Sequence, residues 1–153
     1  MESYEQISTK DLDLLKSAIL QEVNAEKRYA KHLANVNNEK IREVLKELHL
    51  AEKTHKEALF EEIKKYLPFY TLDENRLWGM EIKKDMLEGA GDDFKLISSI
   101  ININLEKEKE AMNQYKGYSK EAESDLLSEL FIEFRKEEAA HVKTLMNLKK
   151  EFC

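Results

Sequence analysis

The feature that most constrains this fold is a duplicated Glu-x-x-His motif on apolar helical stripes. Glu52 and His55 form the first copy, in LAEKTHKEAL, and Glu138 and His141 form the second, in FRKEEAAHVKTL. One copy means little in a chain so rich in Glu, but the second copy lies 86 positions after the first. The same offset aligns further residues of the two halves: Glu22 with Glu108, Ala25 with Ala111, Tyr29 with Tyr115, and Leu59 with Leu145. The two halves therefore share one layout.

Apolar residues at helical spacing predict four long helices. The expected helix starts are Ser8 or Thr9, Asn38, Asp92 or Asp93, and Ser124, with breaks at 35–38 and 117–124. The second helix should stop before Pro68, and residues 68–91 predict a crossover that carries a short helix near 74–88. Two antiparallel helix pairs joined by a long crossover make an all-α, ferritin-like four-helix bundle. We expect one domain over residues 1–153, with an internal repeat of approximately 9–66 and 92–151.

Composition excludes several classes of function. The 153 residues suit a single core, and the net charge of −6 without a basic cluster argues against nucleic acid as a partner. No apolar run is long enough to span a membrane, and the polar start MESYEQIST is unlike a signal peptide. Cys153 is the single cysteine, which excludes a disulfide framework and a four-cysteine metal site within one chain, so a reducing cytoplasm is the expected location.

The duplicated motif predicts a metal site. Residues i and i+3 share one face of a helix, so the stripes that bury Leu48 and Leu59 must also bury Glu52 and His55. A buried carboxylate without a partner is costly, and we expect no Lys or Arg on the inward stripes. Two divalent cations would balance four carboxylates at mid-bundle, from Glu22, Glu52, Glu108 and Glu138. Oxygen and imidazole ligands suit two iron ions, with manganese or zinc as substitutes. The alternative is that these are solvated helix charges and two ordinary histidines.

The chain resembles the rubrerythrin-type branch of ferritin-like di-iron proteins over residues 9–150. AILQEVNAEKRY and INLEKEKEAMNQY resemble the first and third helices of that family, and the two motif segments resemble the second and fourth. The resemblance implies that Glu22 and His55 hold one iron, that Glu108 and His141 hold the other, and that Glu52 and Glu138 bridge them. These six residues would be catalytic through the metal. Tyr29 and Tyr115 are either core aromatics or, as the family implies, hydrogen-bond donors to ligand carboxylates.

Two departures from that family bear on activity. Rubrerythrins carry a rubredoxin-like domain with an iron held by four cysteines, which this sequence lacks, so a separate electron-donor protein is expected. They also carry an extra Glu one turn after the third-helix ligand, where this chain has Ala111. Peroxidase activity is therefore expected to be reduced.

Three functions remain open. The first is a di-iron oxidoreductase that reacts with O2 or hydrogen peroxide, of peroxidase or ferroxidase type, in oxidative stress or iron handling. The second is a ferroxidase linked to iron storage, and the third is a non-catalytic helical interaction module stabilised by metal. A homodimer is expected. Asn104 should face inward, either to orient a ligand or to cap a polar pocket, whereas His32 and His49 should lie on the surface.

Overall fold

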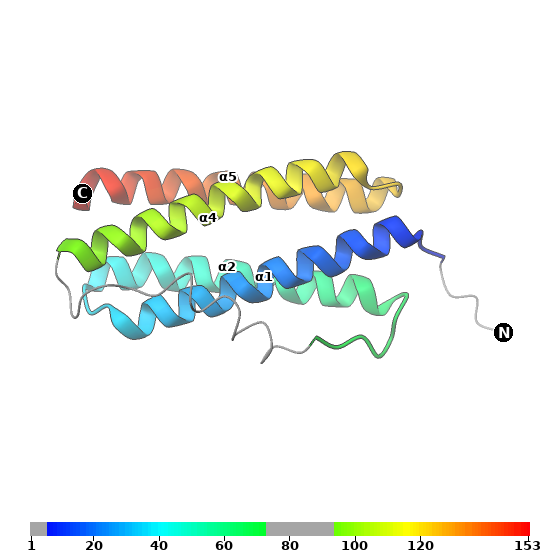
Figure 1. The fold of residues 1–153 in the computed structure, drawn as a ribbon, viewed down its shortest axis with the longest axis horizontal. Helices are drawn as coiled ribbons and strands as arrows, with labels where there is room; N and C mark the ends of the chain where they lie inside the picture. Colours follow the sequence, from blue (N-terminus) through cyan, green and yellow to red (C-terminus); the bar gives the residue numbers. More distant parts are fainter. Residues whose placement is uncertain (1–5, 73–93) are drawn as a thin grey trace.

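The computed structural model describes residues 6–72 and 94–153, and its regular elements within these ranges are four α-helices. They are α1 (Thr9–Asn35), α2 (Glu39–Lys64), α4 (Phe94–Glu121) and α5 (Asp125–Phe152). α1 and α2 form one antiparallel hairpin and α4 and α5 form another; the hairpins pack together with α1 antiparallel to α4 (Figure 1). The predicted all-α four-helix bundle is therefore confirmed. The predicted short helix near 74–88 and the cap at Asp92 or Asp93 lie outside the described residues.

Short polar side chains begin three of these helices where the sequence predicts. Ser8 Oγ accepts a hydrogen bond from the backbone N–H of Asp11 at 3.1 Å, and Asn38 Oδ1 accepts one from Ile41 at 3.1 Å. Ser124 Oγ accepts from the N–H of Leu127 at 3.4 Å. Each cap satisfies one of the N–H groups that lack a partner at a helix start.

The predicted break at 117–124 is wrong for most of its length, because α4 continues to Glu121. A glycine inside a helix costs only about 1 kcal/mol relative to alanine, so Gly117 does not end the helix. Tyr118, the next residue, packs its ring 5.9 Å from that of Tyr115 and 5.5 Å from that of Phe131, centroid to centroid. This packing offsets the cost of the glycine.

The core consists of two apolar clusters, one toward each end of the bundle. The first includes Tyr29, Leu45, Leu48, Ile101 and Leu145, and the second includes Leu15, Ile19, Leu59, Tyr115 and Phe131. Every helix contributes to both clusters. α2, α4 and α5 carry their predicted Glu or Glu-x-x-His between the two contributions, and Glu22 of α1 lies directly before Val23, the last residue of α1 in the second cluster. The fold therefore places these polar residues in one layer at the middle of the bundle.

A buried carboxylate joins the two hairpins at one end of the bundle. Asp11, near the start of α1, is 2% exposed, and its two oxygens accept hydrogen bonds from the backbone N–H groups of Glu123 and Ser124 at 2.8 and 2.9 Å. These N–H groups precede α5, where negative charge is favoured by the helix dipole. Asp11 thus fixes the start of α1 against the α4–α5 turn.

The outer faces of the helices are polar. Of the large apolar side chains that remain exposed on helices, Leu50 lies on α2 and Phe94 on α4, and α5 carries Leu126, Ile132 and Met146. Among the helices described, none is both long and apolar enough to cross a lipid bilayer.

Candidate metal centre

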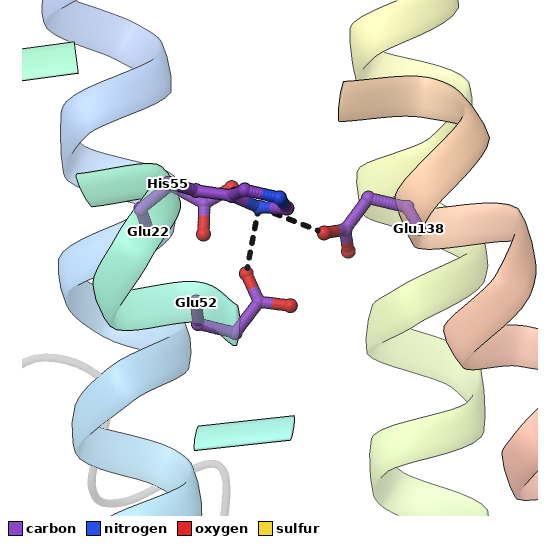
Figure 2. Close-up of side chains that lie close together, drawn as sticks. All are labelled: Glu22, Glu52, His55 and Glu138. Atoms are coloured by element: carbon purple, nitrogen blue, oxygen red, sulfur yellow. Dashed lines mark ion pairs between the residues drawn. The ribbon is translucent and has the colours of Figure 1, made fainter. Parts of the chain in front are cut away.

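All four helices contribute to the polar layer between the apolar clusters. α1 supplies Glu22, α4 supplies Glu108, and α2 and α5 supply the two Glu-x-x-His motifs. Each of the four carboxylate residues is 1% exposed. Figure 2 shows Glu22, Glu52 and His55 on one side of the bundle, facing Glu138 on the other. Four acidic side chains are therefore withdrawn from water into one small volume.

The six predicted ligands form two groups that share two carboxylates. One group is Glu22, Glu52, His55 and Glu138, and the other is Glu52, Glu108, Glu138 and His141; within each group, one ligand atom per residue lies within 4.8 Å of the others. His55 Nδ1 lies 3.3 Å from an oxygen of Glu138 and 3.5 Å from an oxygen of Glu22. His141 Nδ1 lies 3.2 Å from an oxygen of Glu52. Glu52 and Glu138 belong to both groups, so the six residues could hold two neighbouring metal ions.

The donor atoms that converge here fit a metal ion. The Nδ1 atoms of both histidines and at least one oxygen of each carboxylate are buried and make no ordinary hydrogen bond among the described residues; each Nδ1 faces only the carboxylates of the cluster, as a close ion pair. A buried polar group left without a partner costs about 1–3 kcal/mol, and a charged one costs more. Carboxylate oxygens with imidazole, and no thiolate, are a donor set suited to iron, manganese or zinc. The residues present therefore fit a divalent metal ion.

Two tyrosines hold the outer carboxylates across the bundle. The Tyr29 hydroxyl on α1 donates to Glu108 on α4 at 2.5 Å, and the Tyr115 hydroxyl on α4 donates to Glu22 on α1. Both tyrosines are fully buried, and burial followed by the facing carboxylate raises the pKa of each phenol well above its ordinary value. They therefore remain protonated donors that orient these carboxylates. The two bonds are reciprocal because α1 and α4 run antiparallel, so the tyrosine of each helix faces the carboxylate of the other.

Without metal, the carboxylates of the cluster divide into protonated and charged forms. Burial, followed by the charge of Glu52, raises the pKa of Glu22 well above its ordinary value. Burial and the neighbouring Glu108 likewise raise the pKa of Glu138. Burial works against the charged form of Glu52, but its interactions with Glu22 and then His141 hold its pKa well below the usual range. Like charges held close together cannot all ionise, so protons replace part of the missing positive charge.

The imidazoles also carry protons in the metal-free cluster. Burial would lower the pKa of His141, but its interactions with Glu108 and Glu52 raise it to about 9. Burial opposes the charge of His55 in the same way, and its interactions with Glu138, Glu22 and Glu52 raise its pKa strongly. A metal ion that binds Nδ1 must displace these protons, so metal binding and protonation compete at this site.

Glu137 contacts the site, although no sequence pattern distinguishes it from other glutamates. Its carboxylate lies 2.6 Å from His55 Nε2, on the side of the ring away from the cluster. The residue is on α5, directly before Glu138, and its side chain is 55% exposed. In sequence it is one of many surface glutamates, and only the packing of α5 against α2 brings it behind His55.

A buried cation also lies beside the site, which corrects the expectation that no Lys or Arg faces inward. Arg28 on α1 is 8% exposed, and its Nε donates to Asn104 Oδ1 at 2.8 Å. Asn104 faces inward as predicted, and its amide nitrogen bonds to the carbonyl of Ile100 and to His32 Nδ1, both at 2.8 Å.

His32 is fully buried, so the prediction that it lies on the surface is wrong. Burial, followed by the charges of Arg28 and Lys31, lowers its pKa to about 3, which keeps the ring neutral and lets Nδ1 accept from Asn104. The buried face of α1 is therefore wider than the apolar pattern of the sequence indicates, because Arg28 and His32 lie on it beside Tyr29.

A cleft between α1 and α4 leads from the surface to the cluster. Its volume is about 390 Å³, and all four carboxylate residues of the cluster line it. Ala25 and Ala111, which occupy equivalent positions of the repeat, line it from the two helices, together with the polar side chains of Gln21 and Gln114. Small side chains at these two positions leave a route for a small molecule to the carboxylates.

Comparisons with known proteins show the fold. No protein-family model matches this chain, and no curated protein matches its sequence. Among solved structures, it is similar to a two-domain protein from Anabaena variabilis that contains DJ-1/ThiJ/PfpI-like and ferritin-like domains, with a TM-score of 0.70 and 16% sequence identity. The match covers 95% of this chain and 41% of that protein, so this chain spans less than half of its length. At this identity the likeness supports the ferritin-like bundle and carries no statement about activity.

Proposed function

We propose that this chain is a rubrerythrin-type di-iron protein whose centre reacts with O2 or hydrogen peroxide. The observation that carries the proposal is the convergence, from all four helices, of buried oxygen and nitrogen atoms that face one another and lack ordinary hydrogen bonds. Four carboxylates need about four positive charges, which two divalent ions supply and two protonated imidazoles do not. Glu22 and His55 would hold one ion, Glu108 and His141 the other, and Glu52 and Glu138 would be shared between them.

When bound, two iron ions supply one-electron chemistry toward O2 or peroxide, which no side chain of this cluster can perform. The protein contributes geometry: the tyrosine hydroxyls hold Glu22 and Glu108 in place, and the apolar clusters on both sides exclude bulk water. The cleft beside Ala25 and Ala111 admits a small oxidant to the carboxylates. Electrons that return the centre to its reduced state would come from a separate donor protein.

Ala111 favours O2 over peroxide in this proposal. The rubrerythrin family has a glutamate at this position, one turn after the ligand that corresponds to Glu108, and here a methyl group lines the cleft instead. The extra carboxylate that would follow a moving ion is therefore absent from this position. We expect slower peroxide reduction than in a typical rubrerythrin.

The proposal is tested by loading the metal-free protein with Fe(II) without oxygen and then adding O2 or peroxide. The near-ultraviolet absorption of a di-ferric centre should appear at about two irons per chain. His55→Leu and His141→Leu should each abolish the band, and His49→Leu, which changes a partly exposed histidine on the same helix as His55, should retain it.

Three outcomes would contradict the proposal. A band that persists in the double variant His55→Leu/His141→Leu would place the iron elsewhere on the acidic surface. Continued uptake of far more than two irons per chain, with growth of a mineral, would indicate iron storage instead. Fe(III) that forms but is never reduced by any added donor, with no turnover of O2 or peroxide, would leave a structural metal site.

A further inference from the structure

The repeat provides an internal comparison of the two proposed metal positions. The ligands correspond in pairs: Glu22 with Glu108, Glu52 with Glu138, and His55 with His141. The tyrosines that donate to the outer carboxylates correspond as well. If the surroundings also matched, the two positions would bind a metal ion equally. Differences behind the ligands therefore predict differences in affinity.

The first difference lies behind the imidazoles. His55 Nδ1 faces the cluster, while Nε2 lies 2.6 Å from Glu137. When Nδ1 binds a metal, the Nε2–H group donates to this carboxylate. Such a partner fixes the tautomer and ring orientation and makes the imidazole a better donor; its loss typically lowers metal affinity 10- to 100-fold.

His141 has a different neighbour at the equivalent position. The residue 86 positions before Glu137 is Ala51, directly before Glu52, and a methyl group cannot accept a hydrogen bond. The side chain of His141 is also 14% exposed, against 4% for His55. The ring of His55 stacks on Phe134 at 4.3 Å between centroids, whereas the repeat position of Phe134 is Leu48. The imidazole of His55 is therefore the better positioned of the two.

The second difference is a buried cation on the side of Glu108. Arg28 lies beside Tyr29, with its guanidinium carbon 5.0 Å from the centre of that ring, and Tyr29 donates to Glu108. Asn104, one turn before Glu108, holds Arg28 in place. The repeat position of Arg28 is the neutral Gln114. The buried charge of Arg28 on the Glu108 side disfavours a second cation there, because like charges repel more strongly where water is excluded.

We propose that the two metal positions are inequivalent: the Glu22–His55 position binds first and more tightly, and the Glu108–His141 position is the weaker and more readily exchanged. Glu137 is the positioning residue that sets this order. This inference rests on the proposed two-ion centre and adds the order in which it fills. The difference at the imidazoles and the difference at Arg28 both make the metal affinity of the Glu22–His55 position the higher of the two.

The test is a titration of the full metal-free chain with Co(II) in the absence of oxygen, followed by calorimetry and by the visible spectrum. Two steps should separate by about tenfold or more. Glu137→Gln should weaken the first step by about tenfold and bring the steps together, and Glu133→Gln, an exposed glutamate one turn earlier on α5, should change neither. Ala51→Glu places a carboxylate at the repeat position and should tighten the second step.

Crystals grown with one equivalent of Co(II) provide a readout that needs no variant. Anomalous scattering should place the ion beside His55. An ion beside His141, equal occupancy of both positions, or unchanged steps in Glu137→Gln would each overturn the order while leaving the two-ion centre intact. Failure to bind any ion would overturn the centre and the order together. Glu137 is on the surface, so its variant should fold, and it decides the question even if Ala51→Glu does not fold.

Discussion

Removing the metal should make the stability of this protein depend on pH, and His141 sets the size of the effect. Its pKa is 6.5 when unfolded and about 9 in the metal-free fold, where Glu108 and Glu52 favour its charged form despite burial. A pKa raised by folding contributes stability that is fully present below pH 6.5 and is lost as the pH rises through 9. At 1.36 kcal/mol per pKa unit, this single histidine contributes about 3 kcal/mol.

Other groups of the cluster act in the same direction. His55 has a strongly raised pKa, and the raised values of Glu22 and Glu138 also remove stability as the pH increases. Glu52 acts oppositely, since its lowered pKa removes stability only as the pH falls through the acid range. For a domain of this length, about 3 kcal/mol corresponds to a fall of roughly 6–12 °C in melting temperature between pH 6.5 and 9.

The assay is a set of thermal melts of chelated and metal-loaded protein at pH 6.5 and 9. Metal replaces the protons and binds only the folded chain, so each site held at 100 times its Kd adds about 2.7 kcal/mol, or roughly 5 kcal/mol for two. The gap between loaded and chelated protein should therefore widen at pH 9, and the pH-dependent part should shrink in chelated His141→Gln. A gap that is the same at both pH values, or that is unaffected by this substitution, would refute the reasoning.

Three further predictions concern residues that are not proposed metal ligands. Tyr29→Phe and Tyr115→Phe remove the hydrogen-bond donors to Glu108 and Glu22, and each should weaken metal binding by about tenfold or more in calorimetry. The control Tyr70→Phe should leave the affinity unchanged. Equal affinities in all three variants would show that the two hydroxyls do not position the carboxylates. Asp11→Ala should lower the free energy of unfolding in urea by about 1–3 kcal/mol and leave the metal stoichiometry unchanged. Asp13→Ala, at an exposed position of the same helix, is the control. No loss of stability in Asp11→Ala would mean that water replaces the carboxylate at the α4–α5 turn. Ala111→Glu should raise peroxide turnover relative to O2 consumption by the iron-loaded protein, and an unchanged ratio would show that this position does not set the preference.

The helices and their starts were predictable from sequence because local chemistry determines them. Apolar spacing and the caps Ser8, Asn38 and Ser124 specify where three helices begin without reference to tertiary structure. The end of α4 was not predictable in this way, because it depends on packing of Tyr118 against Phe131, a residue of another helix.

The cluster followed from sequence for a different reason. The 86-residue offset matches residues of two halves that pack against each other, so equivalent positions meet at the same level of the bundle. The 86-residue offset does not predict which residues contact a ligand on the side away from the cluster. Glu137 and Arg28 break the repeat, and both reach the site from a helix other than the one that carries the ligand beside them. Their positions depend on side-chain conformation and on how closely the hairpins approach.

In the proposed centre, the polar layer holds two metal ions through two shared carboxylates. The decisive experiment is elemental analysis of the full chain, loaded with Fe(II) without oxygen and freed of excess metal. We predict two ions per chain, fewer than one in Glu52→Ala or Glu138→Ala because each variant weakens both positions, and two in the exposed-site control Glu133→Ala. One ion or none in the unmodified chain, or two ions retained when Glu52 and Glu138 are both replaced, would contradict it.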